Sequence, residues 1–100
     1  MVQFSITFKI KPEMKEEYQK AHDNIWPDYA KAVRDAGITN QSIFYKKDGT
    51  LFIYLEADDP EKSLKIVADN PLNTKWQRAI DKFILKGSGF NELLEALKEV

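Results

Sequence analysis

A strictly alternating stretch near the N-terminus most limits how this chain can fold. Apolar side chains occupy every second position of residues 2–10, with polar ones between them: the apolar set is Val2, Phe4, Ile6, Phe8 and Ile10. Successive side chains of a strand point to opposite faces, so this period of two predicts a strand with one buried face. In a chain of 100 residues, long enough for one core, we expect one two-layer α/β domain spanning residues 1–100.

Two helices are predicted after this strand. Pro12 suits the first turn of a helix, and apolar residues then recur at three- and four-residue intervals until Gly37, which can end a helix. Pro27 interrupts this pattern because it removes the backbone hydrogen bond to residue 23. We therefore predict two helices that meet near Asp23 or Asn24 rather than one straight helix.

Residues 41–56 are predicted to form a β-hairpin around Asp48-Gly49, a dipeptide suited to a two-residue type I′ turn. One predicted face mixes aromatic rings with hydrogen-bonding groups, as a ligand-facing or partner-facing surface would, although a solvated sheet face often does the same. Pairing outward from the turn places on this face Gln41, Ile43, Tyr45, Phe52, Tyr54 and Glu56. The other predicted face carries Ser42, Phe44, Lys46, Leu51, Ile53 and Leu55.

The second half of the chain predicts another pair of helices and a tail. Asp59-Pro60-Glu61 and Asn70-Pro71 each have the polar cap and proline that begin a helix. The tail, residues 90–100, suits either a helix or a strand. If it is a strand, the order is β-α-β-β-α-β, which is an α+β ferredoxin-like sandwich with a four-stranded antiparallel sheet. Helices would cover one face of this sheet, and we expect a homodimer to cover the other.

Composition excludes several classes of function. Fifteen basic and sixteen acidic residues are intermixed and give a net charge of -1, which makes nucleic acid an unlikely partner. No apolar run is long enough for a membrane span or a secretory signal, so we expect a cytoplasmic protein. Without cysteine, and with one histidine, neither a disulfide nor a Cys/His-rich metal site is available. We expect neither metal nor cofactor.

His22 is the candidate catalytic residue. Imidazole titrates near neutrality, at about pH 6.5, and can serve as a general acid or base. In a helix, Tyr18 lies one turn before His22 on the same stripe, so the two rings can share a pocket wall. A solvated or hydrogen-bonded histidine and an ordinary amphipathic tyrosine are the alternatives. The break near Pro27 leaves the placement of Trp26 open, and core packing is expected for that ring.

Trp76 lies on one face of a later predicted helix, and core packing is its simplest role. An indole can also stack on the C–H face of a sugar, but no spacing argument brings Trp76 beside His22. Glu56, at the end of a predicted strand, is either paired with a buried partner or solvated.

The sequence resembles the L-rhamnose mutarotase family over most of its length. The most specific stretch is Glu-Glu-Tyr-x3-His-x2-Ile-Trp-Pro, residues 16–27, supported by residues 40–45, residues 51–56 and Trp76. The resemblance implies a small cytoplasmic, dimeric α/β-barrel isomerase that interconverts the anomers of L-rhamnose or a related deoxy sugar without a cofactor. It also implies that His22 is the general acid, with Tyr18 and Trp76 contacting the monosaccharide.

The sequence departs from this family at Gln41 and Gln77, where members typically carry a tyrosine and a second tryptophan, and in its C-terminal ending. Two other functions remain open. One is a dimeric α/β-barrel monooxygenase or haem-degrading protein, although the only histidine lies early in the chain. The other is a non-catalytic sugar-binding or assembly module.

Overall fold

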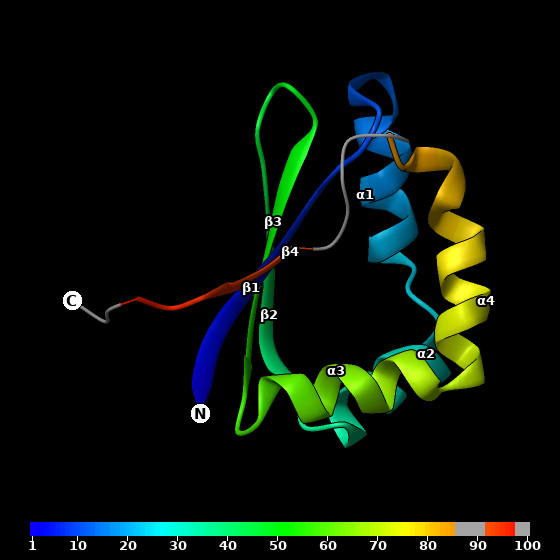
Figure 1. The fold of residues 1–100 in the computed structure, drawn as a ribbon. Helices are drawn as coiled ribbons and strands as arrows, with labels where there is room; N and C mark the ends of the chain where they lie inside the picture. Colours follow the sequence, from blue (N-terminus) through cyan, green and yellow to red (C-terminus); the bar gives the residue numbers. More distant parts are fainter. Residues whose placement is uncertain (86–91, 98–100) are drawn as a thin grey trace.

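The computed structural model describes residues 1–85 and 92–97. It contains one sheet that helices cover on a single side (Figure 1). The first half runs through β1 (Val2–Lys9), the 3-10 helix η1 (Pro12–Met14), α1 (Lys15–Asp23), α2 (Pro27–Asp35) and β2 (Thr39–Tyr45). The second half contains β3 (Thr50–Ala57), α3 (Pro60–Asp69), α4 (Pro71–Ile80), the 3-10 helix η2 (Asp81–Phe83) and β4 (Glu92–Glu95). Within the described ranges, no helix has the length and apolar character needed to span a membrane.

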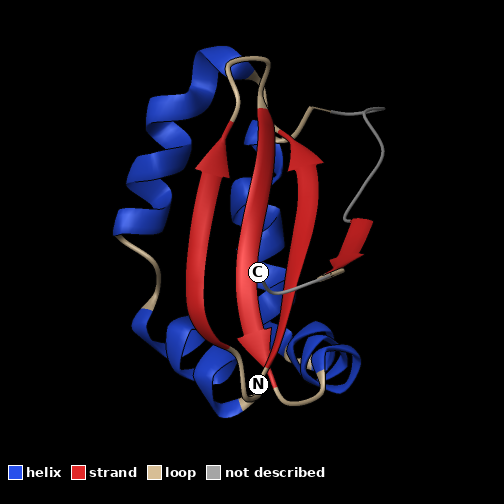
Figure 2. Cartoon of the chain, turned by 90° about the vertical axis from the view of Figure 1, so that its left-hand side faces the viewer, coloured by secondary structure: helices blue, strands red, loops and turns tan. Residues whose placement is uncertain are grey.

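The strand order is β2-β3-β1-β4, and every neighbouring pair is antiparallel (Figure 2). Together with the element order, this is the ferredoxin-like α+β fold expected from the sequence. The described part of the tail supplies the edge strand: β4 pairs with β1 from Phe4 opposite Glu95 to Thr7 opposite Glu92. The rest of the predicted tail, residues 90, 91 and 98–100, lies outside the described residues.

Prolines begin three of the described α-helices, as the sequence predicted for α3 and α4. Each of α2, α3 and α4 has a proline at its first residue, where the missing N–H leaves no intrahelical hydrogen bond unmade. The predicted break is confirmed, because α1 ends at Asp23 and α2 begins at Pro27. The side chains of Asp59 and Asn70 cap the next two helices by accepting hydrogen bonds from the backbone N–H groups of Lys62 and Leu72.

The predicted two-residue turn of the hairpin is wrong. Gly49 N–H donates to the Lys46 carbonyl at 2.9 Å, and Lys46 N–H donates to the Thr50 carbonyl at 2.8 Å, so residues 47–49 form a three-residue loop. Gly49 closes this loop with φ 96°, a left-handed conformation that glycine adopts without strain. A Cβ at this position would also collide with the Ile10 carbonyl oxygen.

One additional loop residue shifts the register and reverses the faces predicted for β2. Ser42 lies opposite Tyr54 and Phe44 lies opposite Phe52. Directly opposite residues share a face, so both β2 side chains belong to the open side of the sheet, with Phe52, Tyr54 and Glu56. Ile43 and Tyr45 are instead paired with Ile53 and Leu51 on the side covered by helices. The predicted mixed face is therefore half correct.

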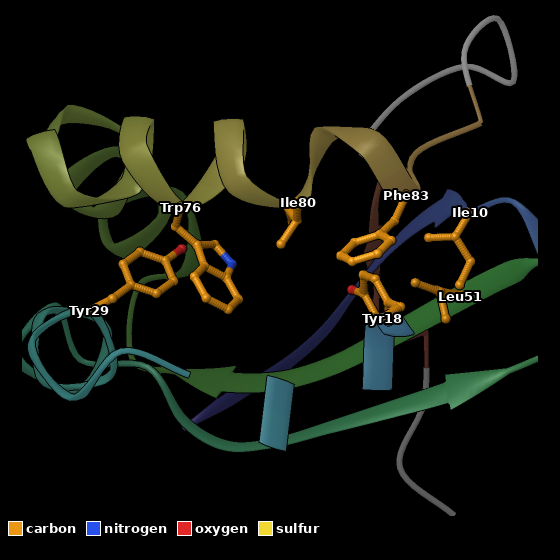
Figure 3. Packing of buried hydrophobic residues seen from close by; sticks show 7 residues of the cluster. All are labelled: Ile10, Tyr18, Tyr29, Leu51, Trp76, Ile80 and Phe83. Atoms are coloured by element: carbon orange, nitrogen blue, oxygen red, sulfur yellow. The ribbon is translucent and has the colours of Figure 1, made fainter. Parts of the chain in front are cut away.

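The main core lies between the helices and this covered side of the sheet (Figure 3). Its buried members come from the residue after β1 and from α1, α2, β3, α4 and η2, and they are Ile10, Tyr18, Tyr29, Leu51, Trp76, Ile80 and Phe83. A second cluster, nearer the other end of the sheet, contains Phe4, Ile38, Leu55 and Ala57. Most of the aromatic residues in the main core come from helices, so helix packing decides the surroundings of His22.

Candidate functional site

His22 lies in the last turn of α1, half-buried beneath α4. Tyr18, one turn earlier, has its ring centroid 4.3 Å from that of the imidazole, as the four-residue spacing predicted. The Nδ1 atom of His22 lies 3.1 Å from the backbone carbonyl oxygen of Tyr18. A carbonyl can only accept a hydrogen bond, so this contact places the proton of the neutral ring on Nδ1. The Nε2 atom is left with the lone pair that takes or returns a proton.

Trp76 reaches the same place from α4. Its indole centroid lies 5.4 Å from the imidazole centroid, with the two planes at 84°. The fold therefore brings Tyr18, His22 and Trp76 into one aromatic cluster, a contact that no spacing in the sequence could establish. Trp76 is only 4% exposed, so it also has the core role that the sequence favoured.

Two further rings surround this indole. Tyr29 of α2 stacks on Trp76 with centroids 5.4 Å apart and planes at 21°. Trp26, half-buried in the link between α1 and α2, meets Trp76 edge to face at 5.2 Å. The indole is thus held on several sides by aromatic contacts, each of which contributes about 0.5–1.5 kcal/mol beyond the area that it buries.

The Tyr18 hydroxyl is a buried polar group that finds no hydrogen-bond partner among the described residues. Tyr18 is 4% exposed, and its burial, with a smaller contribution from Tyr29, raises the pKa of the phenol well above its usual value. The hydroxyl is therefore neutral and keeps a donor and lone pairs available. Buried polar groups are nearly always hydrogen-bonded, so such a group calls for an explanation.

Burial also lowers the pKa of His22 below its usual value of 6.5, against the opposing effects of the Tyr18 carbonyl and the Asp23 carboxylate. Removing an imidazole from water disfavours its charged form. His22 is accordingly a neutral base at neutral pH, able to accept a proton at Nε2 and to release it readily.

The remaining predicted residues lie elsewhere or act differently. Gln41 is exposed beside an irregularity in the pairing of β2 with β3. Gln77, also exposed, donates from Nε2 to Asn73 Oδ1 at 3.3 Å. Glu56 is on the open side of the sheet, where its carboxylate accepts hydrogen bonds from Asn40 and Tyr54.

Sequence reasoning missed Tyr29 and Asn73. The Tyr29 hydroxyl donates to Asn73 Oδ1 at 2.9 Å, which ties α2 to α4 next to the indole. The spacing of Asn73, Trp76 and Gln77 places all three on one face of a helix and could have indicated a polar contact beside the tryptophan. The break at Pro27 concealed where Tyr29 would point.

The described residues contain no group of three or more acidic or histidine side chains arranged to hold a metal ion. A shallow hollow between α2 and α3 is lined by residues that include Lys31, Asp35 and Ile66. Its lining includes none of the aromatic residues around His22, so we assign it no part in the chemistry.

A family model and individual proteins of known activity match the sequence of this chain. The family model described as L-rhamnose mutarotase matches residues 3–100. An L-rhamnose mutarotase of Bacillus subtilis is 38% identical over 86 residues, covering 85% of this chain and 82% of its own. One from Listeria monocytogenes is 36% identical over 90 residues, covering 89% and 86%.

Solved structures support the fold. The crystal structure of an L-rhamnose mutarotase from Formosa agariphila superposes with a TM-score of 0.77 at 22% identity, covering 100% of this chain and 96% of its own. A putative antibiotic biosynthesis monooxygenase from Nitrosomonas europaea reaches 0.65 at 11% identity, covering 98% and 100%. Identities this low establish a shared architecture alone, so the monooxygenase likeness carries no activity to this chain.

Proposed function

This chain belongs to the L-rhamnose mutarotase family, and from that premise we propose that it is an isomerase that interconverts the anomers of L-rhamnose or a related deoxy sugar. The match over residues 3–100 supports a single functional domain. Gln41 and Gln77 stand where the resemblance implies a tyrosine and a second tryptophan, so the identity of the sugar is the first property to measure.

His22 is the proposed acid and base. Opening the pyranose requires loss of the proton from the anomeric hydroxyl, delivery of a proton to the ring oxygen and cleavage of the bond between that oxygen and the anomeric carbon. The aldehyde then rotates and closes on its other face with the two proton transfers reversed. Opening removes one proton and delivers one, so Nε2 of His22 can accept the proton of the anomeric hydroxyl and donate a proton to the ring oxygen. General acid–base catalysis of this kind contributes on the order of 10²–10⁴-fold.

The buried Tyr18 hydroxyl is the observation that carries this proposal. Burying a hydroxyl without a partner costs about 1–3 kcal/mol. A sugar hydroxyl beside His22 would supply the missing hydrogen bond and would orient the ring oxygen toward the imidazole. A tyrosine with only a structural role would gain no hydrogen bond for its hydroxyl in this position, whereas a tyrosine that binds the substrate would.

Trp76 is the proposed apolar contact of the pyranose. Its ring is 4% exposed and stacked on Tyr29, so a sugar reaches it only when a neighbouring side chain moves. Trp26 is the neighbour that we expect to move, because it lies in the link between two helices and is only partly buried.

Two further properties belong to this proposal. Mutarotation transfers no electrons, so the reaction is proposed to proceed without a cofactor. A homodimer is proposed to cover the open side of the sheet, where Phe44 is 61% exposed. A protein titled a dimeric ferredoxin-like protein shares the fold, with a TM-score of 0.71 at 18% identity.

The test is NMR saturation exchange between the anomers of L-rhamnose, L-fucose and ordinary aldoses. His22→Ala is expected to lower the enzymatic exchange rate by about 10²–10⁴-fold. Gln19→Ala, at an exposed position of the same helix, serves as the matched control and should retain the wild-type rate. Exchange by His22→Ala at the wild-type rate would remove histidine from the mechanism, and sugar binding without exchange by the wild type would identify a binding protein.

A further inference from the structure

Tyr29 contacts the face of Trp76, whereas His22 and Trp26 meet that ring edge to face. A stacked neighbour limits how far an indole can shift perpendicular to its own plane. A stacked contact also covers more of a ring than an edge-to-face contact does. Figure 3 shows the Tyr29 ring beside the indole. The position of Trp76 relative to the imidazole therefore depends most on where the Tyr29 ring is held.

The Tyr29 ring is itself anchored at its far end. Its hydroxyl donates to Asn73 Oδ1 at 2.9 Å, and Gln77 Nε2 donates to the same oxygen at 3.3 Å. Tyr29 is only 7% exposed and its hydrogen bond is part-buried, so water competes for this bond less than it would at the surface. Asn73 and Gln77 flank Trp76 on α4, and the anchor and the indole thus belong to one rigid helix.

We propose that Tyr29 is a positioning residue whose ring, anchored to Asn73 through its hydroxyl, holds Trp76 against His22 in the arrangement that binds the sugar. This proposal depends on the proposed function for the identity of the substrate, but the geometry from which it is argued does not. Tyr29 itself touches no reacting atom. Its action passes through Trp76, which contacts both the imidazole and the proposed pyranose site.

The test combines kinetics with one NMR signal. Tyr29→Phe keeps the stacked ring and removes only the anchor. We expect KM for the sugar to rise about twofold to tenfold, as loss of one net hydrogen bond would produce, with kcat changed less than about twofold. His22 is the only histidine, so its ring proton gives a single titration curve. That curve should move toward the ordinary histidine pKa as the loosened indole admits water.

Asn73 supplies the matched pair of variants. Asn73→Ala removes the acceptor and should reproduce the KM of Tyr29→Phe, whereas Asn73→Asp keeps an acceptor oxygen and should restore it to near the wild-type value. Thr74→Ala, at an exposed neighbouring position, should alter neither KM nor the His22 titration. Melting curves establish that each variant is folded.

The outcomes separate this inference from the proposed function. If Tyr29→Phe retains the wild-type KM, or leaves the His22 titration unchanged, Tyr29 is not a positioning residue. If the wild type exchanges no anomers of any sugar in the panel, the proposed function fails. The His22 titration of Tyr29→Phe then still decides whether the anchor holds the indole against the imidazole.

Discussion

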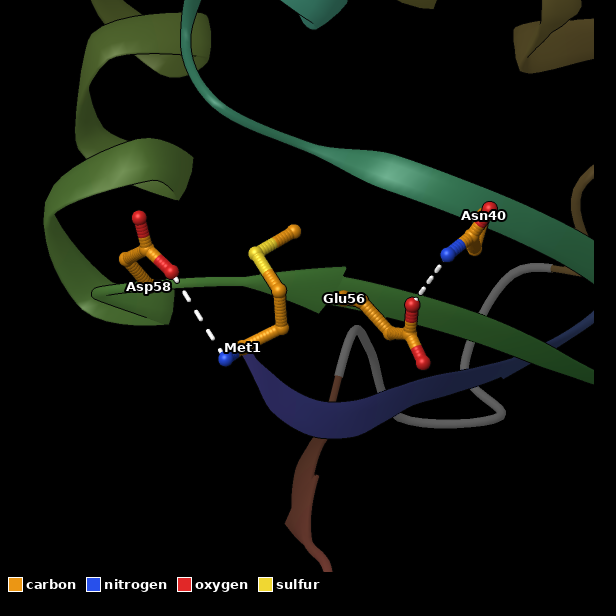
Figure 4. Close-up of polar contacts among 4 residues, drawn as sticks. All are labelled: Met1, Asn40, Glu56 and Asp58. Atoms are coloured by element: carbon orange, nitrogen blue, oxygen red, sulfur yellow. Dashed lines mark hydrogen bonds and ion pairs between the residues drawn. The ribbon is translucent and has the colours of Figure 1, made fainter.

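His22 and Glu56 are both ionisable groups with a lowered pKa, yet their surroundings differ in kind. His22 is enclosed by aromatic rings, and desolvation lowers its pKa. Glu56 lies on the open side of the sheet, where a hydrogen bond from Asn40 (Figure 4) and another from Tyr54 lower its pKa. The same direction of shift therefore favours a neutral imidazole in one place and a charged carboxylate in the other.

This difference separates a group suited to proton transfer from one suited to structure. Within residues 1–85 and 92–97, the hydrogen bond of the His22 ring is the one at Nδ1, so a proton taken up at Nε2 is not held there by an acceptor. A carboxylate held by two donors is stabilised as an anion and is a poor base. Near Glu56, the N-terminal amine of Met1 lies 3.7 Å from Asp58, a polar contact between the residue before β1 and the residue after β3 (Figure 4).

The largest effect should come from removing the aromatic enclosure of His22. Trp76→Ala is expected to lower the free energy of unfolding by about 3–5 kcal/mol, because it deletes a buried ring and leaves a cavity. It should also raise the pKa of His22 toward 6.5, since water would reach the imidazole. Urea denaturation and an NMR titration measure the two quantities.

Trp26→Ala is the matched control for that substitution. Trp26 is half-buried, so the loss of stability should be smaller than for Trp76→Ala. Equal losses would contradict the assignment of Trp76 as the central ring of the cluster.

The same Tyr→Phe substitution should change the free energy of unfolding in opposite directions at two positions. Tyr18→Phe removes a buried hydroxyl that has no hydrogen-bond partner among the residues that the structure describes. It is expected to stabilise the fold by about 1 kcal/mol while lowering sugar exchange. Tyr29→Phe removes a hydroxyl that donates to Asn73 and is expected to destabilise it by about 1 kcal/mol. Thermal or urea unfolding distinguishes them, and destabilisation by Tyr18→Phe would indicate that its hydroxyl is already satisfied in the free protein.

The environment of Glu56 depends partly on backbone conformation. Asn40 has φ 52°, in the left-handed region, and its side chain donates to Glu56. Both Asn40→Gly and Asn40→Ala lose this hydrogen bond, but only alanine is strained in the left-handed conformation. The Asn40→Ala variant should therefore be less stable than the Asn40→Gly variant by about 1 kcal/mol. In both variants the pKa of Glu56 should rise, which an NMR titration of its carboxyl carbon can follow.

Stability on acidification should distinguish the two groups by pH window, and this is the smallest effect. Below 6.5, the unfolded chain protonates its histidine before the folded protein does, so stability falls as the pH drops from 6.5 to the lowered pKa of His22. Glu56, with an ordinary pKa of 4.5, loses its stabilisation only below that value.

Variants identify the group responsible for each of these two losses of stability on acidification. His22→Gln should abolish the first step in a plot of unfolding free energy against pH. Glu56→Gln should reduce the second step, to which Asp48 also contributes because hydrogen bonds from Thr50 lower its pKa. A first step that persists in His22→Gln would show that another group titrates there.

Patterns among residues close in the sequence were sufficient to predict most of the strands and helices and one contact of the site. The alternation in residues 2–10 and the prolines at positions 27, 60 and 71 act through nearest neighbours along the chain, so they determine strands and helix starts. The pairing of Tyr18 with His22 was predictable for the same reason, since four residues are one helical turn. The hairpin shows where such rules stop, because one additional loop residue reversed the faces of β2.

The sequence by itself determined the kinds of chemistry available, a single imidazole with a tyrosine one turn away. It also determined the order of strands and helices as far as the tail, which suited either a strand or a helix. Tertiary structure alone decided that Trp76 meets His22 and stacks on Tyr29, and that Asn73 anchors Tyr29. It also decided that the Tyr18 hydroxyl is buried without a hydrogen-bond partner in the part of the chain that the structure describes. The physical reason is that desolvation and ring contacts depend on how α1, α2 and α4 pack. That packing joins residues more than 40 positions apart, such as Tyr29 and Asn73, which no periodicity relates.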